Sequence, residues 1–292
     1  MSYKITAYST ALFSTWINVE ELGLLIDAGD GVSAGLLQKS RKVKHVFITH
    51  PDRDHLTGLP QFIQLNARKD WPKVYYPSDS RSFPAMRDFL RKFDPHIPAT
   101  DWLPVEDGSQ VEIKKQIVVE AMRNEHIKCP VGVHKSLSYK AYEVKHKLKP
   151  EFLTLSGREI KDLITQKGRE YAMQPVRTNI VSFSGDTPVD DYAKWDGSQI
   201  LIHEATFLKP EGDTVNDPRI NKHSHVDEVL KMVSEINVDK LILSHFSTRY
   251  NREEIDNAVR KYIKAYQIKI PVYLIYPGEV KRDVLNGEIV NE

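Results

Sequence analysis

Short hydrophobic runs recur along the chain, and polar residues end each of them. Six runs have the length and the β-branched or aromatic content of buried strands. They cover residues 22–27, 46–48, 74–76, 180–183, 200–202 and 241–243. Two further runs, residues 111–113 and 117–121, flank the polar turn 114–116 and predict a pair of neighbouring strands. Strands are therefore expected in both halves of the chain.

Several segments between these strands have hydrophobic residues at helical spacing. We expect helices over residues 32–39, after His55 and over residues 84–93, where hydrophobic residues recur at helical spacing. A further helix should begin just after His223, with Ser224 as its cap. Its hydrophobic face would comprise Val226, Val229, Leu230, Val233 and Ile236. The alternation of strands and helices predicts an α/β fold.

Composition limits the kind of protein. The chain has 292 residues, 40% of them hydrophobic and 28% charged, which is typical of a globular protein. We expect one domain over residues 1–292, because no linker or repeat interrupts the pattern. There is no hydrophobic run long enough for a membrane span, no signal pattern at the N-terminus and a single cysteine, Cys129. These features predict a cytoplasmic protein that contacts no membrane.

The closest grouping of potential metal ligands in the sequence follows the hydrophobic run 46–48. His50, Asp52, Asp54 and His55 lie within six residues, and Pro51 forces the chain out of the sheet. Imidazoles and carboxylates together suit zinc, manganese or iron, and two such ions can assist hydrolysis. The alternative is a solvated polar turn without a metal. We interpret the segment as the signature of a metal-dependent hydrolase.

Further polar residues follow the later strands. Gly185-Asp186-Thr187 comes after residues 180–183, and His203-Glu204-Ala205-Thr206-Phe207 overlaps the end of the next run. His223-Ser224 and the segment Ser244-His245-Phe246-Ser247-x-Arg249-Tyr250 complete the set. With the motif around His50, these segments resemble the metallo-β-lactamase fold and, within it, the ribonuclease Z family of tRNA 3′-processing endonucleases. The resemblance implies an αββα sandwich with two mixed sheets flanked by helices.

The same resemblance implies a site with two divalent metal ions, with zinc as the expected metal. The implied ligands are His50, Asp52 and His126 for one ion, Asp54, His55 and His245 for the other, and Asp186 as a bridge between them. Two cations would generate a hydroxide that attacks a phosphodiester, and Asp54 would orient it. His223, held by Glu204, would protonate the leaving oxygen.

Several assignments have competitors in the sequence. His134 competes with His126 as a ligand, and His225 competes with His223 as the acid. Arg249 and Tyr250 are candidates for substrate binding, and the alternative is that they stabilise the last loop.

Three features depart from the family pattern. Asp52 stands where ribonuclease Z normally has a histidine, which makes manganese or iron possible at that site. No glycine occurs over residues 7–16, where the family has several. Residues 148–170 resemble the family's substrate arm in reduced form, without its Gly-Pro pair.

Three functions follow from these observations. The first is an endoribonuclease of the ribonuclease Z type that acts on a tRNA precursor. The resemblance also suggests a homodimer. This first function predicts that the basic segment 128–170, with ten Lys or Arg against five acids, lies beside the metal cleft. The second is a phosphodiesterase for cyclic nucleotides or other small esters. The third is an inactive relative that binds RNA.

Overall fold

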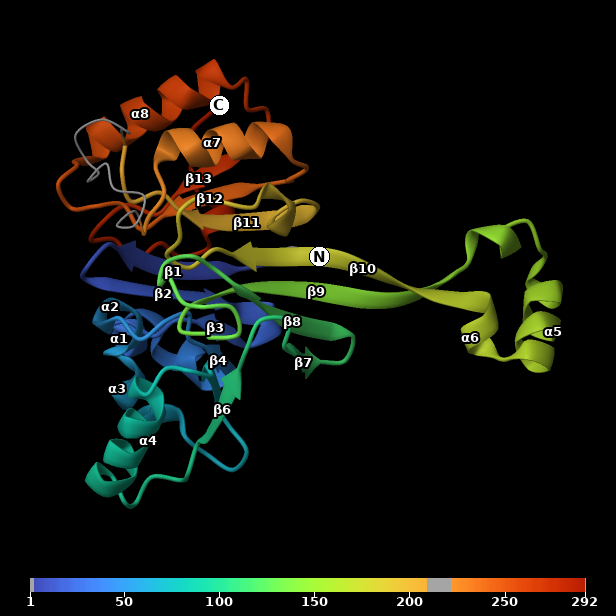
Figure 1. The fold of residues 1–292 in the computed structure, drawn as a ribbon, viewed down its shortest axis with the longest axis horizontal. Helices are drawn as coiled ribbons and strands as arrows, with labels where there is room; N and C mark the ends of the chain where they lie inside the picture. The colour runs from blue at the N-terminus through green and yellow to red at the C-terminus, as the bar shows by residue number, and fades with distance from the viewer. Residues whose placement is uncertain (1–2, 209–221, 292) are drawn as a thin grey trace.

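Two β-sheets pack face to face, and helices cover their outer faces (Figure 1). The computed structural model describes residues 3–208 and 222–291. The strands of the six-stranded sheet follow chain order: β1 (Ile5–Thr10), β2 (Ser14–Val19), β3 (Leu24–Ile26), β4 (His45–Phe47), β5 (Lys73–Pro77) and β6 (Asp101–Val105). Strands β1 to β3 are antiparallel, whereas β3 to β6 are parallel, so this sheet is mixed.

The seven-stranded sheet is also mixed. Its strands are β7 (Gln110–Lys114), β8 (Ile117–Arg123), β9 (Leu137–Leu148), β10 (Met173–Phe183), β11 (Ser198–Glu204), β12 (Leu241–Ser244) and β13 (Val272–Leu274). Strands β7 to β10 are antiparallel, and β10 to β13 are parallel. The predicted pair at residues 111–113 and 117–121 is confirmed as β7 and β8.

Three hydrophobic layers stabilise this arrangement. Leu24 and Ile26 belong to the core between the sheets, whereas Leu25 faces the helices on the other side of β3. Both faces of β3 are thus buried, which explains its uninterrupted hydrophobic sequence. The helices α1 (Val32–Leu36), α2 (Arg53–Leu56), α3 (Leu59–Asn66) and α4 (Ser82–Phe93) cover the first sheet, and α7 (Val226–Glu235) and α8 (Arg252–Ala265) cover the second. The predicted αββα sandwich is confirmed.

Helix boundaries differ from the sequence expectation in two places. The α-helix expected over residues 32–39 ends at Leu36, because Leu37 has a φ of +50°, and a 3₁₀ helix continues to Lys42. Ser224 does not cap α7 as expected. Its hydroxyl donates to the carbonyl of Thr187 at 2.6 Å, and the helix is instead capped by His225. A contact between distant segments thus determines where this helix begins.

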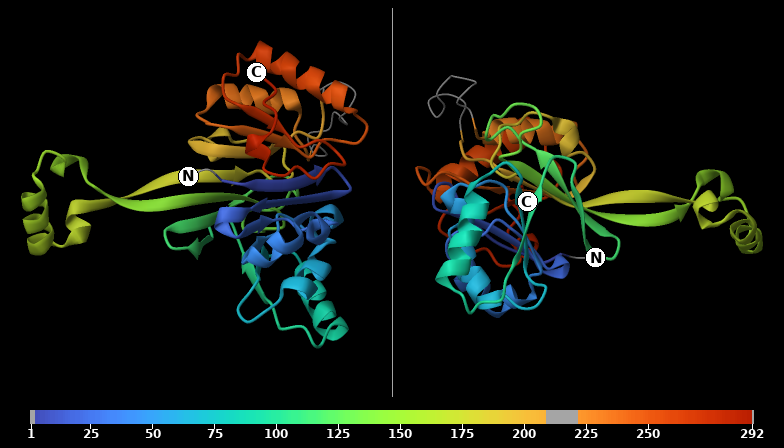
Figure 2. Two further views of the ribbon diagram at one scale, coloured as in Figure 1. Left: turned by 180° about the vertical axis from the view of Figure 1, so that it is seen from behind. Right: turned by 60° about the horizontal axis from the view of Figure 1, so that its bottom comes forward.

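A narrow arm leaves the body of the protein on the extended strands β9 and β10 (Figure 2). Residues 145–148 of β9 pair with residues 173–176 of β10 beyond the last pair that β9 makes with β8. The ribbon carries the helices α5 (Gly157–Lys167) and α6 (Arg169–Ala172) at its tip. Within the described residues, no helix has the length and hydrophobicity to cross a membrane.

Candidate metal centre

Polar residues that follow the parallel strands gather at one end of both sheets. They include Asp27 after β3, His50 after β4, Asp186 after β10 and His245 after β12. Strands that run parallel place these positions at the same edge of a sheet. The backbone N–H of Leu137 donates to the carbonyl of Thr49 at 2.9 Å and joins the two edges. Side chains from both sheets can therefore contact one another.

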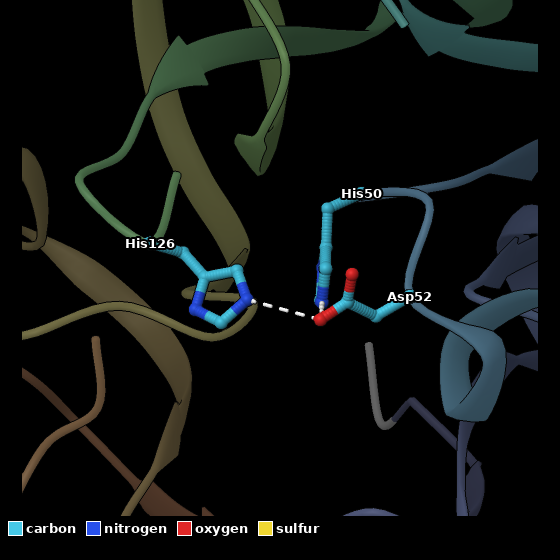
Figure 3. A group of neighbouring side chains, drawn as sticks. All are labelled: His50, Asp52 and His126. Atoms are coloured by element: carbon cyan, nitrogen blue, oxygen red, sulfur yellow. Dashed lines mark ion pairs between the residues drawn. The ribbon is translucent and has the colours of Figure 1, made fainter. Parts of the chain in front are cut away.

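One group of potential ligands comprises His50, Asp52 and His126 (Figure 3). The Asp52 Oδ2 atom lies 3.7 Å from Nε2 of His50 and 3.5 Å from Nε2 of His126. Both imidazoles are buried, whereas the Asp52 side chain is 56% exposed. Asp52 thus lies at the solvent side of this group.

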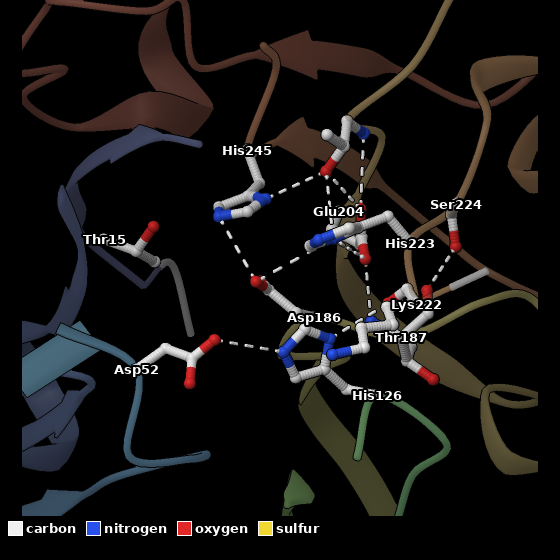
Figure 4. A network of polar contacts seen from close by, with 12 residues as sticks. Thr15, Asp52, His126, Asp186, Thr187, Glu204, Lys222, His223, Ser224 and His245 are labelled. Atoms are coloured by element: carbon white, nitrogen blue, oxygen red, sulfur yellow. Dashed lines mark hydrogen bonds and ion pairs between the residues drawn. The ribbon is translucent and has the colours of Figure 1, made fainter. Parts of the chain in front are cut away.

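A second group comprises Asp54, His55 and His245. The Asp54 Oδ2 atom lies 3.5 Å from Nε2 of His55 and 3.6 Å from Nε2 of His245. Asp186 lies between the two groups (Figure 4). Its Oδ2 atom is 3.4 Å from both of these Nε2 atoms and 3.8 Å from Nε2 of His50. A carboxylate in this position can contact ions on both sides.

The hydrogen bonds of the four histidines determine which ring nitrogen faces the centre. The Nδ1 atom of His126 donates to the carbonyl of Lys222 at 3.1 Å, and that of His55 donates to Asp27 at 2.8 Å. His50 donates from Nδ1 to the hydroxyl of Thr49, which itself donates to Asp27. The same arrangement holds for His245, whose Nδ1 lies 2.9 Å from the hydroxyl of Thr206. Each ring therefore directs its Nε2 atom toward the centre.

These inward nitrogens are suited to binding a metal ion. The Nε2 atoms of His50, His55 and His245 are buried without a hydrogen-bond partner. Burial, together with the neighbouring His55 and His126, holds the pKa of His50 well below its usual value, so this ring is neutral. Neutral imidazoles oriented through their other nitrogen, next to ionised carboxylates, are typical ligands of divalent cations. The donor set thus indicates a site for divalent metal.

Residues 23–246 match the beta-lactamase superfamily domain, which spans most of the chain. The protein named tRNase Z TRZ1 from Arabidopsis thaliana is 30% identical over 265 residues, covering 88% of this chain and 90% of that protein. The chain belongs to the beta-lactamase superfamily and its ribonuclease Z family. The ribonuclease Z of Methanocaldococcus jannaschii is 25% identical over 292 residues, covering 89% of each chain.

A solved structure agrees with this family at the level of the fold. The metallo-beta-lactamase fold protein YhfI from Bacillus subtilis superposes with a TM-score of 0.61 over 96% of this chain and 98% of that one, at 14% identity. The predicted resemblance to ribonuclease Z is confirmed, and the protein is a metal-dependent hydrolase.

The ribonuclease Z segment His203–Thr206 contributes a buried carboxylate beside the ligands. Nδ1 of His223 donates to Oε1 of Glu204 at 3.0 Å. Burial lowers the pKa of His223, but the carboxylate of Glu204 outweighs this effect and raises the pKa to about 9. The Nδ1 atom of His223 lies 3.9 Å from Oδ2 of Asp186. A protonated imidazole is therefore adjacent to the two ligand groups.

Thr206 connects this pair to the ligands. Its hydroxyl donates to Oε2 of Glu204 at 2.5 Å and accepts from Nδ1 of His245. One hydroxyl therefore orients both a ligand of the second group and the carboxylate that holds His223.

The two histidines that compete for these roles in the sequence, His134 and His225, belong to neither ligand group. His134 pairs with Asp79 at 3.7 Å, and His225 pairs with Glu228 at 3.5 Å. Arg249 lines the hollow above the ligands, with its guanidinium 5.4 Å from the ring centre of Phe207. Tyr250 lines a neighbouring hollow.

The sequence pattern indicates no role for Asp27, Thr49 or Thr206, although all three orient candidate ligands. Asp27 carries a signal that could have been used, because it ends the hydrophobic run next to the one that leads to His50. The hydroxyls of Thr49 and Thr206 carry none, since their partners come from other loops.

Replacing Thr206 should weaken metal binding. Thr206→Val keeps the shape of the side chain but leaves Nδ1 of His245 and Oε2 of Glu204 without the hydroxyl. Loss of such an orienting contact lowers metal affinity by about 10- to 100-fold. Competition with a chromophoric chelator measures this affinity, and Thr206→Ser, which restores the hydroxyl, should bind nearly as the wild type. Equal affinity of the valine variant would contradict this role.

Proposed function

We propose that this protein is an endoribonuclease that removes the 3′ extension of precursor tRNA. The observation that carries the proposal is the convergence of four oriented Nε2 atoms and Asp186 beside the pair of His223 and Glu204. The relatives named ribonuclease Z or tRNase Z support the substrate, because their names specify RNA processing.

The residues of the site have separate roles in the proposed reaction. His50, Asp52 and His126 would hold one ion, Asp54, His55 and His245 the other, and Asp186 would contact both. When bound, divalent cations supply the Lewis acidity that lowers the pKa of water to about 7 and stabilises charge on the phosphate. Asp54 accepts a hydrogen bond from the N–H of Leu12 at 3.1 Å, which orients its carboxylate. His223 delivers a proton to the leaving ribose oxygen.

The arm is the second support for an RNA substrate. Tyr171 at its tip is exposed, and the ammonium groups of Lys149 and Lys167 lie 5.5 and 4.6 Å from its ring centre. Lysines interleaved with an aromatic ring suit the phosphates and bases of RNA. We propose that residues 148–170 form the substrate arm of a single domain.

The location expected for the basic segment is wrong for most of its length. Strand β9 begins at Leu137, which bonds to the loop of His50, and ends at Leu148. An extended strand rises about 3.3 Å per residue, so the tip is roughly 35 Å from the ligands. A substrate that contacts both must be long, as a folded tRNA is and a cyclic nucleotide is not.

The hollow above the ligands also argues for a long substrate. Its volume is about 130 Å³, and its lining includes Asp54, Asp186, His223 and Arg249. Pockets that enclose a small molecule usually measure about 300–1,000 Å³. Within the described residues, this hollow by itself is too small to enclose a nucleotide, so the rest of the substrate must contact other surfaces of the protein.

For the metals, we propose zinc in the group of Asp54, His55 and His245. The group of His50, Asp52 and His126 has an oxygen ligand where the family has a nitrogen, which favours manganese or iron there. The homodimer and the cytoplasmic location stay predictions.

Hydrolysis assays test the function. The metal-stripped protein, reloaded with zinc or manganese, should cleave a 3′-extended tRNA precursor, and His55→Ala should abolish cleavage by removing a ligand. His223→Ala should lower the rate by about 10²- to 10⁴-fold on RNA. The same variant should lose much less with bis(p-nitrophenyl) phosphate, because p-nitrophenolate leaves without a proton. His96→Ala, an exposed histidine on another surface, is the matched control.

Other results of these assays would contradict the proposal. Turnover of bis(p-nitrophenyl) phosphate and cyclic mononucleotides alone would indicate a small-ester phosphodiesterase. Absence of any metal-dependent turnover would indicate an inactive RNA-binding relative.

Shortening the arm should selectively impair RNA cleavage. Leu148 and Met173 are paired across the ribbon, so an Asn-Gly turn can replace residues 149–172. Loss of the tip, with its five Lys or Arg and the exposed ring of Tyr171, should lower kcat/KM for the precursor, relative to bis(p-nitrophenyl) phosphate, by at least about tenfold at low salt. It should also reduce the salt dependence of KM for the precursor. An unchanged ratio would show that the arm does not bind the substrate.

Asp52→His should increase zinc selectivity. The substitution exchanges an oxygen ligand for a nitrogen ligand, which zinc binds more readily than manganese does. Metal analysis after dialysis against equimolar zinc and manganese should give a higher zinc-to-manganese ratio than in the wild type. Asp79→His, at a carboxylate outside the ligand groups, should leave the ratio unchanged. The same ratio in wild type and Asp52→His would refute a ligand role for Asp52.

A further inference from the structure

A second hollow, with a volume of about 430 Å³, adjoins the one above the ligands. Four aromatic side chains line it: Tyr8, Phe13, Tyr250 and Tyr276. The same two loops line both hollows. Residues 11 and 12 and residues 247 and 249 face the ligand hollow, whereas residues 10 and 13 and residues 248, 250 and 251 face the aromatic one. The aromatic hollow and the hollow above the ligands therefore lie on either side of the same two loops.

The turn between β1 and β2 forms the boundary between the hollows. Leu12 has a φ of +69°, a conformation that leucine rarely adopts, and its N–H donates to Oδ2 of Asp54. The side chains of Leu12 and Phe13 are 87% and 61% exposed. Neither residue contributes to the core. Strained residues of this kind concentrate at functional sites.

The charges around the aromatic hollow decide what it can bind. The guanidinium of Arg252 lies 4.1 Å from the ring centre of Tyr276. The same guanidinium is 3.7 Å from Glu279 and 3.5 Å from Glu288, so two carboxylates balance its charge. A phosphate would be repelled by these carboxylates, whereas a flat uncharged ring can stack on the aromatic side chains. The hollow therefore suits a nucleobase.

We propose that the aromatic hollow is a subsite for the base of a nucleotide that flanks the scissile phosphate, with Phe13 as its stacking platform. This inference rests on the proposed RNA substrate and adds a base-binding element next to the ligands. The fixed contact between Leu12 and Asp54 places this platform at a constant position relative to the reacting phosphate.

Phe13→Ala tests the subsite. Loss of one stacked base costs a factor of about 5–150 in binding. The ratio of kcat/KM for the RNA precursor to kcat/KM for bis(p-nitrophenyl) phosphate should fall by such a factor, and Phe13→Trp should restore it. Phe93→Ala removes a phenylalanine of similar exposure, 68%, on α4, and serves as the matched control. Its ratio should equal that of the wild type.

Abasic substrates identify the nucleotide. Each substrate carries one abasic site, either at the nucleotide on the 5′ side or at the nucleotide on the 3′ side of the scissile phosphate. At one position, the abasic site should reduce wild-type cleavage as much as Phe13→Ala does, and it should reduce cleavage by the variant no further. Strictly additive losses at every position, or an unchanged ratio for Phe13→Ala, would overturn the subsite while leaving the proposed function intact. Failure of the wild type to cleave RNA would overturn both.

Discussion

One buried carboxylate, Asp27, holds the ligand loops of the first sheet together. It accepts hydrogen bonds from the N–H and hydroxyl of Thr49 and from Nδ1 of His55. Burial raises the pKa of Asp27, and the ring of His55 acts in the opposite direction by favouring the ionised form. Removing a partner would leave a buried charge without compensation, which is strongly destabilising. Through Thr49 and His55, this carboxylate orients a histidine of each ligand group.

Several features of the centre oppose folding. Buried Nε2 atoms converge without partners, and Asp27 and His245 adopt left-handed conformations with φ of +57° and +62°. Gly185, with φ of +61°, precedes Asp186, and a side chain there would crowd Thr49. Each strained residue costs about 1–3 kcal/mol. The hydrophobic layers on both faces of the sheets offset this cost, and binding of ions to the converging lone pairs would add to the stability.

The strand ends could be predicted from sequence because their signals are local. A hydrophobic run followed by a polar turn places His50, Asp186 and His245 at one edge without knowledge of any other segment. The roles of Thr206 and Ser224 could not be predicted, since each depends on which loop its hydroxyl meets across the site. The position of the arm could not be predicted either. Its lysines and arginines are visible in the sequence, but its direction depends on the register of β9 and β10.

The departures from the family pattern share one physical property, which is exposure. Asp52 lies at the solvent side of its group, Leu12 projects from a turn, and the arm stands outside the body. The candidate ligands His55 and His245 are buried among oriented partners, where a substitution would leave polar groups unsatisfied. Exposed positions carry no such penalty. The polar groups of the centre are therefore constrained by packing, whereas these exposed positions can change without loss of the fold.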